Sequence, residues 1–130
     1  MIHHLSVADW CILATALIPL LFTGIAKFGD SDRGFDNRVP RNFQTTLSGW
    51  RARAHWAHQN GMEAFPLFAV AALLAEFRAA PQVWVNALAL AFIVLRLIYG
   101  ALYIADRASL RSIVWALGFL CCVGMFVSAV

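Results

Sequence analysis

Apolar residues dominate four long stretches of the chain, and polar residues gather between them. Each stretch approaches the length of about 20 mostly apolar residues that a helix needs to cross the hydrocarbon core of a bilayer. The two later connections, RAAPQ and ADRASLR, are short, so the helices that they join are expected to run antiparallel. The pattern predicts an all-α integral membrane protein, an up-down bundle of four transmembrane helices in one domain. The predicted spans cover about residues 7–28, 54–77, 83–104 and 112–130 of the single domain 1–130.

The first connection, about residues 29–53, is the longest polar stretch of the chain. It is rich in Gly, Asp, Asn and Arg, a composition typical of a loop outside the bilayer. The opening segment MIHHLSVADW lacks the basic region and small-residue cleavage site of a secretory signal. The first apolar stretch is therefore expected to stay in the protein as a membrane span.

Composition excludes a soluble domain. Hydrophobic residues make up 62% of the 130 residues and charged residues 13%, and the mean hydropathy is +0.71. An ordinary soluble domain is about 45–50% apolar and about 25% charged. A chain this short cannot enclose a large cavity, so any roomy binding site is expected between subunits of an oligomer.

Basic residues are distributed unevenly between the two sides of the predicted bundle. By the positive-inside rule the side that carries most of them is cytoplasmic, which places both termini in the periplasm of a bacterial inner membrane. The loop arginines are few and mixed with Asp30, Asp32 and Asp36, so they indicate contact with anionic lipid headgroups and no nucleic-acid role. The basic side carries Lys27, Arg33, Arg38, Arg41, Arg51, Arg53, Arg107 and Arg111, and the other side carries Arg78.

Cysteine and histidine do not indicate a metal site. The three cysteines, Cys11, Cys121 and Cys122, lie inside apolar stretches without CxxC spacing, which is typical of packing residues. His55 and His58 precede a glutamate but lack the HExxH order of a zinc site. We expect no bound metal.

Two charged residues stand out because they lie well inside predicted spans, Glu63 and Arg96. A charge within a span costs about 2.5–3.5 kcal/mol on insertion scales, so each is a candidate functional residue. Antiparallel packing can bring the two to similar depth, where they could pair. One interpretation is that such a pair only fixes the register of the helices.

Further polar residues lie on the same helix faces as Glu63 and Arg96. Together they favour a binding site. With Arg111 at the start of the fourth span, they predict a pocket rich in hydrogen-bond donors, open to the basic side and suited to a small anionic ligand. The polar residues are His55, Gln59, Asn60 and Glu63 on the second span and Arg96, Tyr99 and Tyr103 on the third.

Two segments resemble the MAPEG family, the membrane-associated proteins in eicosanoid and glutathione metabolism. RAHWAHQNGMEAFPLF is similar to the family's Asn-x-x-Glu-x-x-Pro signature, here Asn60, Glu63 and Pro66. RLIYGALYIADRASLRS is similar to its Arg-x-x-[Tyr/His]-x-x-x-Tyr pattern and to the arginine that begins the fourth helix. The loop DNRVPR resembles a bacterial branch of the family.

The resemblance implies a homotrimer with glutathione bound between neighbouring subunits near the cytoplasmic face. A lipophilic small-molecule substrate would arrive from the bilayer. Carried over by motif, Arg111 would activate the glutathione thiol, with Arg107 as a rival. The implied glutathione-binding residues are Lys27, Arg53, Asn60, Glu63, Arg96, Tyr99, Tyr103 and Ser112.

The implied function is a glutathione-dependent transferase, peroxidase or isomerase acting on lipophilic electrophiles. Two positions depart from relatives that bind glutathione, because Trp56 and Gln59 stand where cationic contacts are found in some of them. These departures favour an alternative, a non-enzymatic trimer that binds lipid. A proton-coupled transporter is disfavoured because no internal repeat or pair of broken helices is evident.

Overall fold

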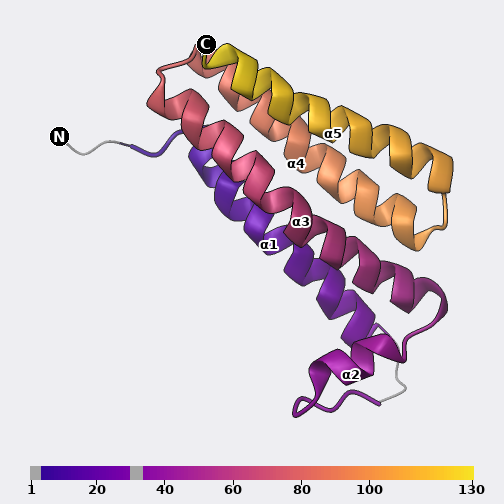
Figure 1. Ribbon diagram of the computed structural model, residues 1–130. Helices are drawn as coiled ribbons and strands as arrows, with labels where there is room; N and C mark the ends of the chain where they lie inside the picture. Colours follow the sequence, from indigo (N-terminus) through magenta and orange to yellow (C-terminus); the bar gives the residue numbers. More distant parts are fainter. Residues whose placement is uncertain (1–3, 30–33) are drawn as a thin grey trace.

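A computed structural model describes residues 4–29 and 34–130 and folds them into five helices (Figure 1). The loop residues Asp30, Asp32 and Arg33, which entered the charge analysis, lie outside this part of the chain. The helices are α1 (Val7–Phe28), α2 (Pro40–Thr45), α3 (Gly49–Phe77), α4 (Gln82–Ile104) and α5 (Ala108–Ser128).

Four of the helices, α1, α3, α4 and α5, are long and apolar enough to cross a membrane. Residues 4–29 and 34–130 contain no β-strand. The prediction of an all-helical, multi-pass membrane protein with four spans is therefore confirmed.

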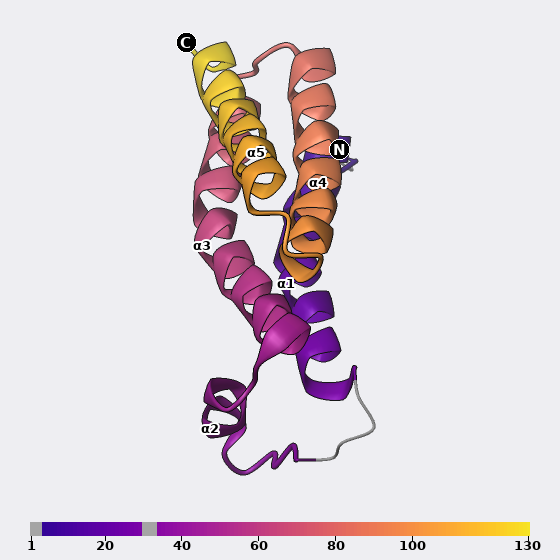
Figure 2. The same cartoon turned by 90° about the vertical axis from the view of Figure 1, so that its right-hand side faces the viewer.

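The long helices pass up and down the bundle in chain order (Figures 1 and 2). Helix α1 packs mainly against α3, and α4 mainly against α5, while α3 also contacts both α4 and α5. We call the end that holds Ser6, the α3–α4 turn and the C-terminus the terminal end. The opposite end, where α2 and the α4–α5 turn lie, is the loop end (Figure 1).

Two helices extend further toward the loop end than the sequence predicted. Helix α3 begins at Gly49 and α5 at Ala108, whereas the spans were expected to begin near residues 54 and 112. Hydropathy locates only the part of a helix that lies in hydrocarbon, and both helices begin with polar turns. The predicted loop also contains the short helix α2, which starts at Pro40, a residue whose fixed φ suits a first helical turn.

Glycines allow two close helix contacts. A Cβ on Gly61 of α3 would lie 2.7 Å from Cγ of Pro19 in α1. A Cβ on Gly100 of α4 would overlap the ring of Phe22. Small residues at such crossings let helices approach closely, which is how helices associate in lipid without a hydrophobic driving force.

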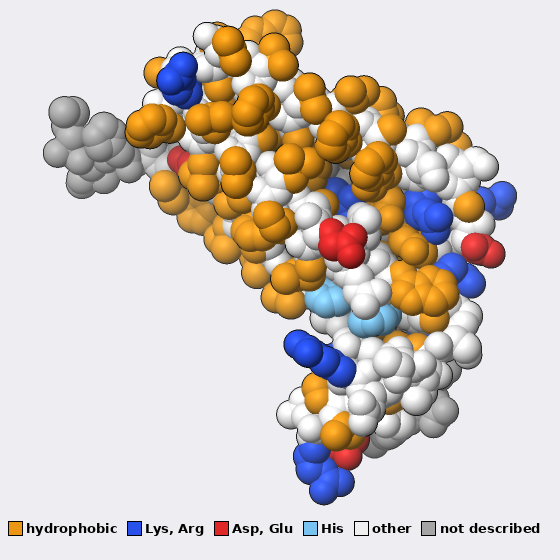
Figure 3. Space-filling model, in the orientation of Figure 1, with side chains coloured by type: hydrophobic (Ala, Val, Ile, Leu, Met, Phe, Trp, Pro, Cys, Tyr) orange, Lys and Arg blue, Asp and Glu red, His pale blue; other side chains and the backbone are white. Residues whose placement is uncertain are grey.

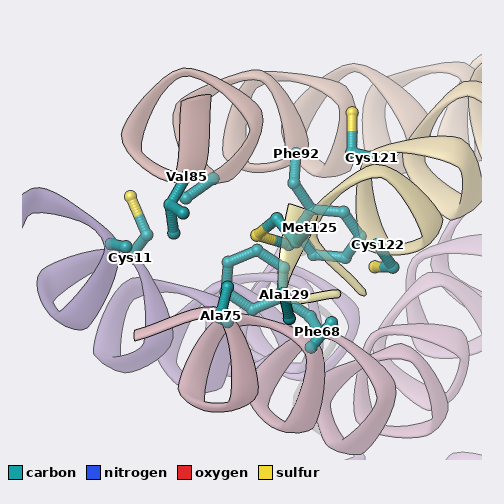
Figure 4. Packing of buried hydrophobic residues seen from close by; sticks show 13 residues of the cluster. Cys11, Phe68, Ala75, Val85, Phe92, Cys121, Cys122, Met125 and Ala129 are labelled. Carbon is teal, nitrogen blue, oxygen red and sulfur yellow. The ribbon is translucent and has the colours of Figure 1, made fainter. Parts of the chain in front are cut away.

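The core lies toward the terminal end and consists of aromatic rings and small side chains (Figure 4). The rings of Phe68 and Phe92 stack with their centroids 4.3 Å apart. All three cysteines, Cys11, Cys121 and Cys122, are buried as free thiols. They pack as the sequence predicted.

Polar side chains at the terminal end bond to one another. Glu76 Oε1 accepts hydrogen bonds from Ser6 Oγ and Gln82 Nε2, both at 2.7 Å. Asn86 Oδ1 accepts from Gln82 Nε2 at 2.9 Å and from the backbone N–H of Ala8 at 3.1 Å. The start of α1, the end of α3 and the start of α4 are thus joined by one network.

At the loop end, two arginines of α3 bind carbonyl groups at the ends of other helices. Arg51 donates from Nε to the carbonyl of Ala26 at 2.9 Å and from Nη2 to that of Lys27 at 3.0 Å. Arg53 Nε donates to the carbonyl of Ile104 at 3.0 Å. A cation at a helix C-terminus satisfies unpaired carbonyls and interacts favourably with the helix dipole. These contacts join the start of α3 to the ends of α1 and α4.

Candidate functional site

A pocket of about 220 Å³ lies between α3, α4 and α5. Asn60 and Glu63 contribute from α3 and Arg96 from α4. Apolar side chains complete it, among them Trp115 and Phe119 of α5. In the space-filling view, the upper part of this face is largely apolar, and acidic and basic side chains lie in its middle and toward its right and lower parts (Figure 3).

Arg96 is the most deeply placed cation of this site, with 6% of its surface exposed. Its Nη2 donates to Asn60 Oδ1 at 2.8 Å, and its guanidinium lies 4.4 Å from the centroid of the Tyr99 ring. These contacts leave further N–H groups of the guanidinium for a ligand. The structure therefore joins Asn60, Arg96 and Tyr99, three of the predicted binding residues.

Glu63 and Arg96, which could pair by their depth in the spans, do not pair within the single subunit. Both residues line the pocket, but they form no ion pair, and Glu63 is exposed. Residues three apart on a helix differ in direction by about 60°. Asn60 thus faces α4, while Glu63 points to the side of the bundle.

An aromatic ladder continues from Arg96 toward the loop end. The rings of Tyr99 and Tyr103 meet edge to face with centroids 5.6 Å apart. The guanidinium of Arg111, from α5, lies 4.1 Å from the centroid of Tyr103. Arg107, the rival to Arg111, is exposed at the N-cap position of α5. Helix packing thus brings Arg111 to the tyrosine stripe of α4.

The remaining predicted binding residues lie outside this cluster. Lys27 Nζ lies over the ring of Phe35, 4.9 Å from its centroid. Arg53 donates a hydrogen bond to the carbonyl of Ile104 at the end of α4. Ser112 is exposed, and its hydroxyl donates to the carbonyl of Ala108 in its own helix. The subunit alone does not bring these three residues to Arg96.

Trp56 and Gln59 are the two positions whose residue types differ from those of relatives that bind glutathione. Trp56 lies near the ladder, and Gln59 lies on the surface. The Trp56 ring lies 6.3 Å from that of Tyr103 and is 48% exposed. Gln59 is exposed on α3. Trp56 therefore presents an apolar surface beside Tyr103 of the ladder.

The two histidines of α3 lie against each other, and His58 contacts α1. A hydrogen bond of 2.9 Å joins His58 Nδ1 and the carbonyl oxygen of Pro19. The rings of His55 and His58 stack with centroids 6.0 Å apart. Across residues 4–29 and 34–130, no cluster of three His, Cys, Asp or Glu side chains has the arrangement of a metal site.

Sequence reasoning missed the α5 wall of the pocket. Trp115 and Phe119 stack on each other with centroids 5.7 Å apart. They follow Arg111 at spacings of four and eight residues, so all three share one helix face. This spacing was a usable signal, but two aromatic residues in an apolar span are also typical of lipid-facing positions.

One face of α3 remains uncovered in the single subunit. It begins with two polar residues near the loop end and becomes apolar toward the terminal end. Its residues alternate in steps of four and three, the spacing by which helices pack along a shared seam. The exposed residues of this stripe are Gln59, Glu63, Pro66, Val70, Leu73 and Phe77.

Comparison with protein families gives one match, and it covers nearly the whole chain. The model of the MAPEG family matches residues 7–130. No curated protein and no solved structure matches the chain. The family includes glutathione transferases and related enzymes, and its members commonly use glutathione. The chain belongs to the MAPEG family.

Proposed function

We propose that this protein is a homotrimeric, membrane-bound, glutathione-dependent transferase that acts on lipophilic electrophiles. The observation that carries the proposal is the ladder Arg96–Tyr99–Tyr103–Arg111, with Asn60 and Glu63 beside it. The ladder presents two guanidinium groups that have no carboxylate partner among the described residues. Such an arrangement suits an anionic ligand that carries a thiol.

The chemistry of glutathione fits the side chains of the site. Glutathione carries two carboxylates, an amine, amide groups and a thiol, which call for cations, a carboxylate and hydrogen-bonding groups. Arg96 would bind a carboxylate, and Glu63 the amine. Asn60 and the tyrosines would bind the peptide groups. A buried arginine without a charged partner is costly in a membrane, and a bound carboxylate would offset that cost.

Arg111 would activate the thiol. A free thiol has a pKa of about 8.5, and only the thiolate attacks electrophiles. Lowering that pKa by about two units requires roughly 2.7 kcal/mol of preferential thiolate stabilisation, which a guanidinium in a partly dry site can supply. The stacking of Arg111 on Tyr103 supports its role, because it holds the guanidinium at the ladder.

The uncovered stripe of α3 supports the trimer. Glu63 is an exposed carboxylate in a membrane-spanning helix, and such a group is costly when it faces lipid. Packing copies of α3 along the stripe would cover Gln59 and Glu63. Lys27 and Ser112 could then reach the ligand from a neighbouring subunit.

We assign the loop end to the cytoplasmic face of a bacterial inner membrane and both termini to the periplasm. Lys27, Arg38, Arg41, Arg51 and Arg53 lie in or beside the α1–α3 connection, and Arg107 and Arg111 at the α4–α5 turn. Arg78 marks the terminal end. The positive-inside rule gives this orientation, and it places the site near the cytoplasmic face.

The test is the ultraviolet difference spectrum of glutathione thiolate bound to the purified protein in detergent. We expect saturable thiolate absorbance in the wild type, its loss in Arg111→Ala, and its retention in Arg107→Ala. The Arg107 variant is the matched control, because it removes an exposed arginine from the same turn. Absence of both thiolate and glutathione binding in the wild type would overturn the proposal.

A second candidate function is a non-enzymatic lipid-binding trimer. It is favoured by Trp56, which places an exposed indole beside Tyr103. An enzyme of this kind must bind glutathione, whereas a scaffold need not, so equilibrium dialysis with labelled glutathione separates the two. Product analysis with hydroperoxide and isomerisable substrates then distinguishes transferase, peroxidase and isomerase.

A further inference from the structure

Three aromatic rings form a row that leads from the inner part of the site to the surface near the loop end. The rings of Tyr99 and Tyr103 have centroids 5.6 Å apart, and the ring of Trp56, from α3, lies 6.3 Å from that of Tyr103. Both separations fall within the range of about 4.5–7 Å that is typical of interacting aromatic pairs. We call Trp56, Tyr103 and Tyr99 the aromatic row.

Exposure to solvent increases along the aromatic row. Tyr99 is 5% exposed and lies beside Arg96, whose guanidinium is 4.4 Å from its ring centroid. Tyr103 is half-buried, and Trp56 is 48% exposed. Trp56 and Asn60 are one turn apart on the side of α3 that faces α4. The row therefore joins a buried inner end to an outer end that lies beside the uncovered stripe of α3.

The outer end of the row lies where α4 ends. Arg53, three residues before Trp56, donates to the carbonyl of Ile104, the last residue of α4. Tyr103 directly precedes Ile104. Tryptophan and tyrosine are enriched at such membrane–water interfaces. Oxidants that are dissolved in water or carried at the headgroup level can reach the indole of Trp56 there.

The order of the rings favours electron transfer toward the surface. Indole and phenol rings are among the side chains that lose one electron most readily. At neutral pH the phenoxyl radical of tyrosine is somewhat more stable than the indolyl radical of tryptophan. An electron therefore moves from Tyr103 to an oxidised Trp56, and the radical moves inward.

Arg111 determines which form of oxidised tyrosine is produced. Its guanidinium lies 4.1 Å from the centroid of the Tyr103 ring. A cation this close disfavours a positive charge on the ring. Tyr103 must therefore lose its phenol proton together with the electron, and the product is a neutral phenoxyl radical beside the two arginines of the site.

We propose that the aromatic row is a one-electron relay, which carries an oxidising equivalent from an oxygen-centred radical at the membrane surface to the site at Arg96 and Arg111. The transfer between the rings depends on the geometry of the subunit alone. The last step rests on the proposed function, because its electron comes from the glutathione thiolate at Arg111. The protein then scavenges radicals in addition to conjugating electrophiles.

The reaction begins with a peroxyl radical of an oxidised lipid. The radical takes the hydrogen atom of the Trp56 indole, so that the N–H bond breaks and the O–H bond of a hydroperoxide forms. The indolyl radical then takes an electron from Tyr103 and a proton from water, while the phenol proton of Tyr103 passes to water. Tyr99 exchanges an electron and a proton with Tyr103 in the same way.

Glutathione returns the tyrosines to their reduced form. The bound thiolate gives one electron to the phenoxyl radical, which takes up a proton, and a glutathionyl radical leaves the site. This radical combines with a second glutathione thiolate, and dioxygen removes the surplus electron. The final products are glutathione disulfide and superoxide, together with the lipid hydroperoxide of the first step.

Pulse radiolysis of the purified protein in detergent tests the transfer between the rings. Azide radicals oxidise exposed tryptophan, and the indolyl and phenoxyl radicals are then followed by their different absorption bands. We expect the indolyl band to decay while the phenoxyl band rises, at one rate that does not depend on protein concentration. Tyr99 and Tyr103 are the two tyrosines of the chain, so the phenoxyl band arises from the aromatic row.

Three variants identify the path of the electron. Trp56→Phe and Tyr103→Phe should each abolish the coupled decay and rise, because each removes a member of the row and keeps an aromatic ring for packing. Trp50→Phe is the matched control, since it removes another exposed tryptophan near the loop end, 38% exposed, and should leave the coupled phase intact. Persistence of that phase in Trp56→Phe, or absence of a phenoxyl rise in the wild type, would overturn the inference.

Glutathione is then added before the pulse. The lifetime of the phenoxyl radical should shorten and reach a limit as the site fills, and in Arg111→Ala the dependence on glutathione should become linear. If the rings exchange an electron but glutathione neither binds nor shortens the lifetime, the proposed function and the last step fail while the transfer between rings is retained. If bound thiolate forms but the coupled phase is absent, the relay alone fails.

Discussion

Similar polar residues differ in their bonding partners between the two ends of the bundle. Two glutamates of α3 show this difference. Glu76, at the terminal end, accepts hydrogen bonds from Ser6 and Gln82. Glu63, nearer the loop end, is exposed and has no hydrogen-bond or ion-pair partner among the described residues. The first carboxylate joins three helices, and the second remains free for a ligand or a neighbouring subunit.

Four arginines toward the loop end also differ in the groups that they contact. Arg51 and Arg53 bind the final carbonyls of α1 and α4, so they stabilise the fold. Arg96 and Arg111 lie against tyrosine rings and bond to no carboxylate in residues 4–29 and 34–130. Arginines that bind the backbone ends of other helices maintain the architecture, and those that contact only Asn60 and tyrosine rings are candidates for binding.

The largest expected effect comes from Arg96→Leu. Glutathione affinity should fall by about 30-fold or more, because removing one partner of a buried charge pair costs about 2–5 kcal/mol. Thermal stability should change little, because the lost hydrogen bond to Asn60 is offset by the removal of a buried cation that has no charged partner in the subunit. Isothermal titration and circular dichroism melting in detergent measure the two effects. A large loss of stability would show that Arg96 belongs with the structural residues instead.

Glu63→Gln sharpens the comparison between the glutamates. The loss of a hydrogen bond to a charged amine costs about 1.5–3 kcal/mol, so glutathione affinity should fall about 10- to 100-fold. Stability should stay the same, because no contact within the subunit is lost. Unchanged affinity measured by titration would remove Glu63 from the site.

Glu76→Ala is the reciprocal change at the terminal end. It removes the acceptor of the Ser6 hydroxyl and one of the two acceptors of the Gln82 amide, which should destabilise the protein by about 1–3 kcal/mol. Glutathione affinity should not change. Chemical denaturation monitored by circular dichroism tests this, and a loss of affinity without a loss of stability would reverse the assignment of the two ends.

The smallest effect is expected in the loop. Arg38 donates hydrogen bonds to Asp36 through its side chain and its backbone N–H, and these bonds hold the pKa of the Asp36 carboxyl below its ordinary value. A lowered pKa in the folded state stabilises the fold above the ordinary carboxyl pKa, and that contribution is lost as the pH falls through the lowered value. Because the Arg38 side chain is exposed and the Asp36 side chain is partly exposed to water, Asp36→Asn should leave the melting temperature at pH 7 unchanged within error. A clear decrease would show that the loop contributes to the stability of the bundle.

The sequence by itself determined the class of the protein and predicted several residues of the candidate site. Four apolar stretches dictated four spans, because a helix in lipid must satisfy its own backbone and reach across the bilayer. The motif residues Asn60, Glu63 and Arg96 were identified from their cost in a membrane and from their spacing. Both inferences depend on distances along one helix, which the sequence fixes directly.

Only the tertiary structure decided which faces meet. It paired Arg96 with Asn60 instead of Glu63, bound Arg53 to the end of α4, and set Trp115 against the pocket. Periodicity shows which residues share a face of one helix, but the rotation and depth of neighbouring helices depend on side-chain packing at contacts such as Gly61 with Pro19. Those contacts join residues far apart in the chain, so no local pattern contains them.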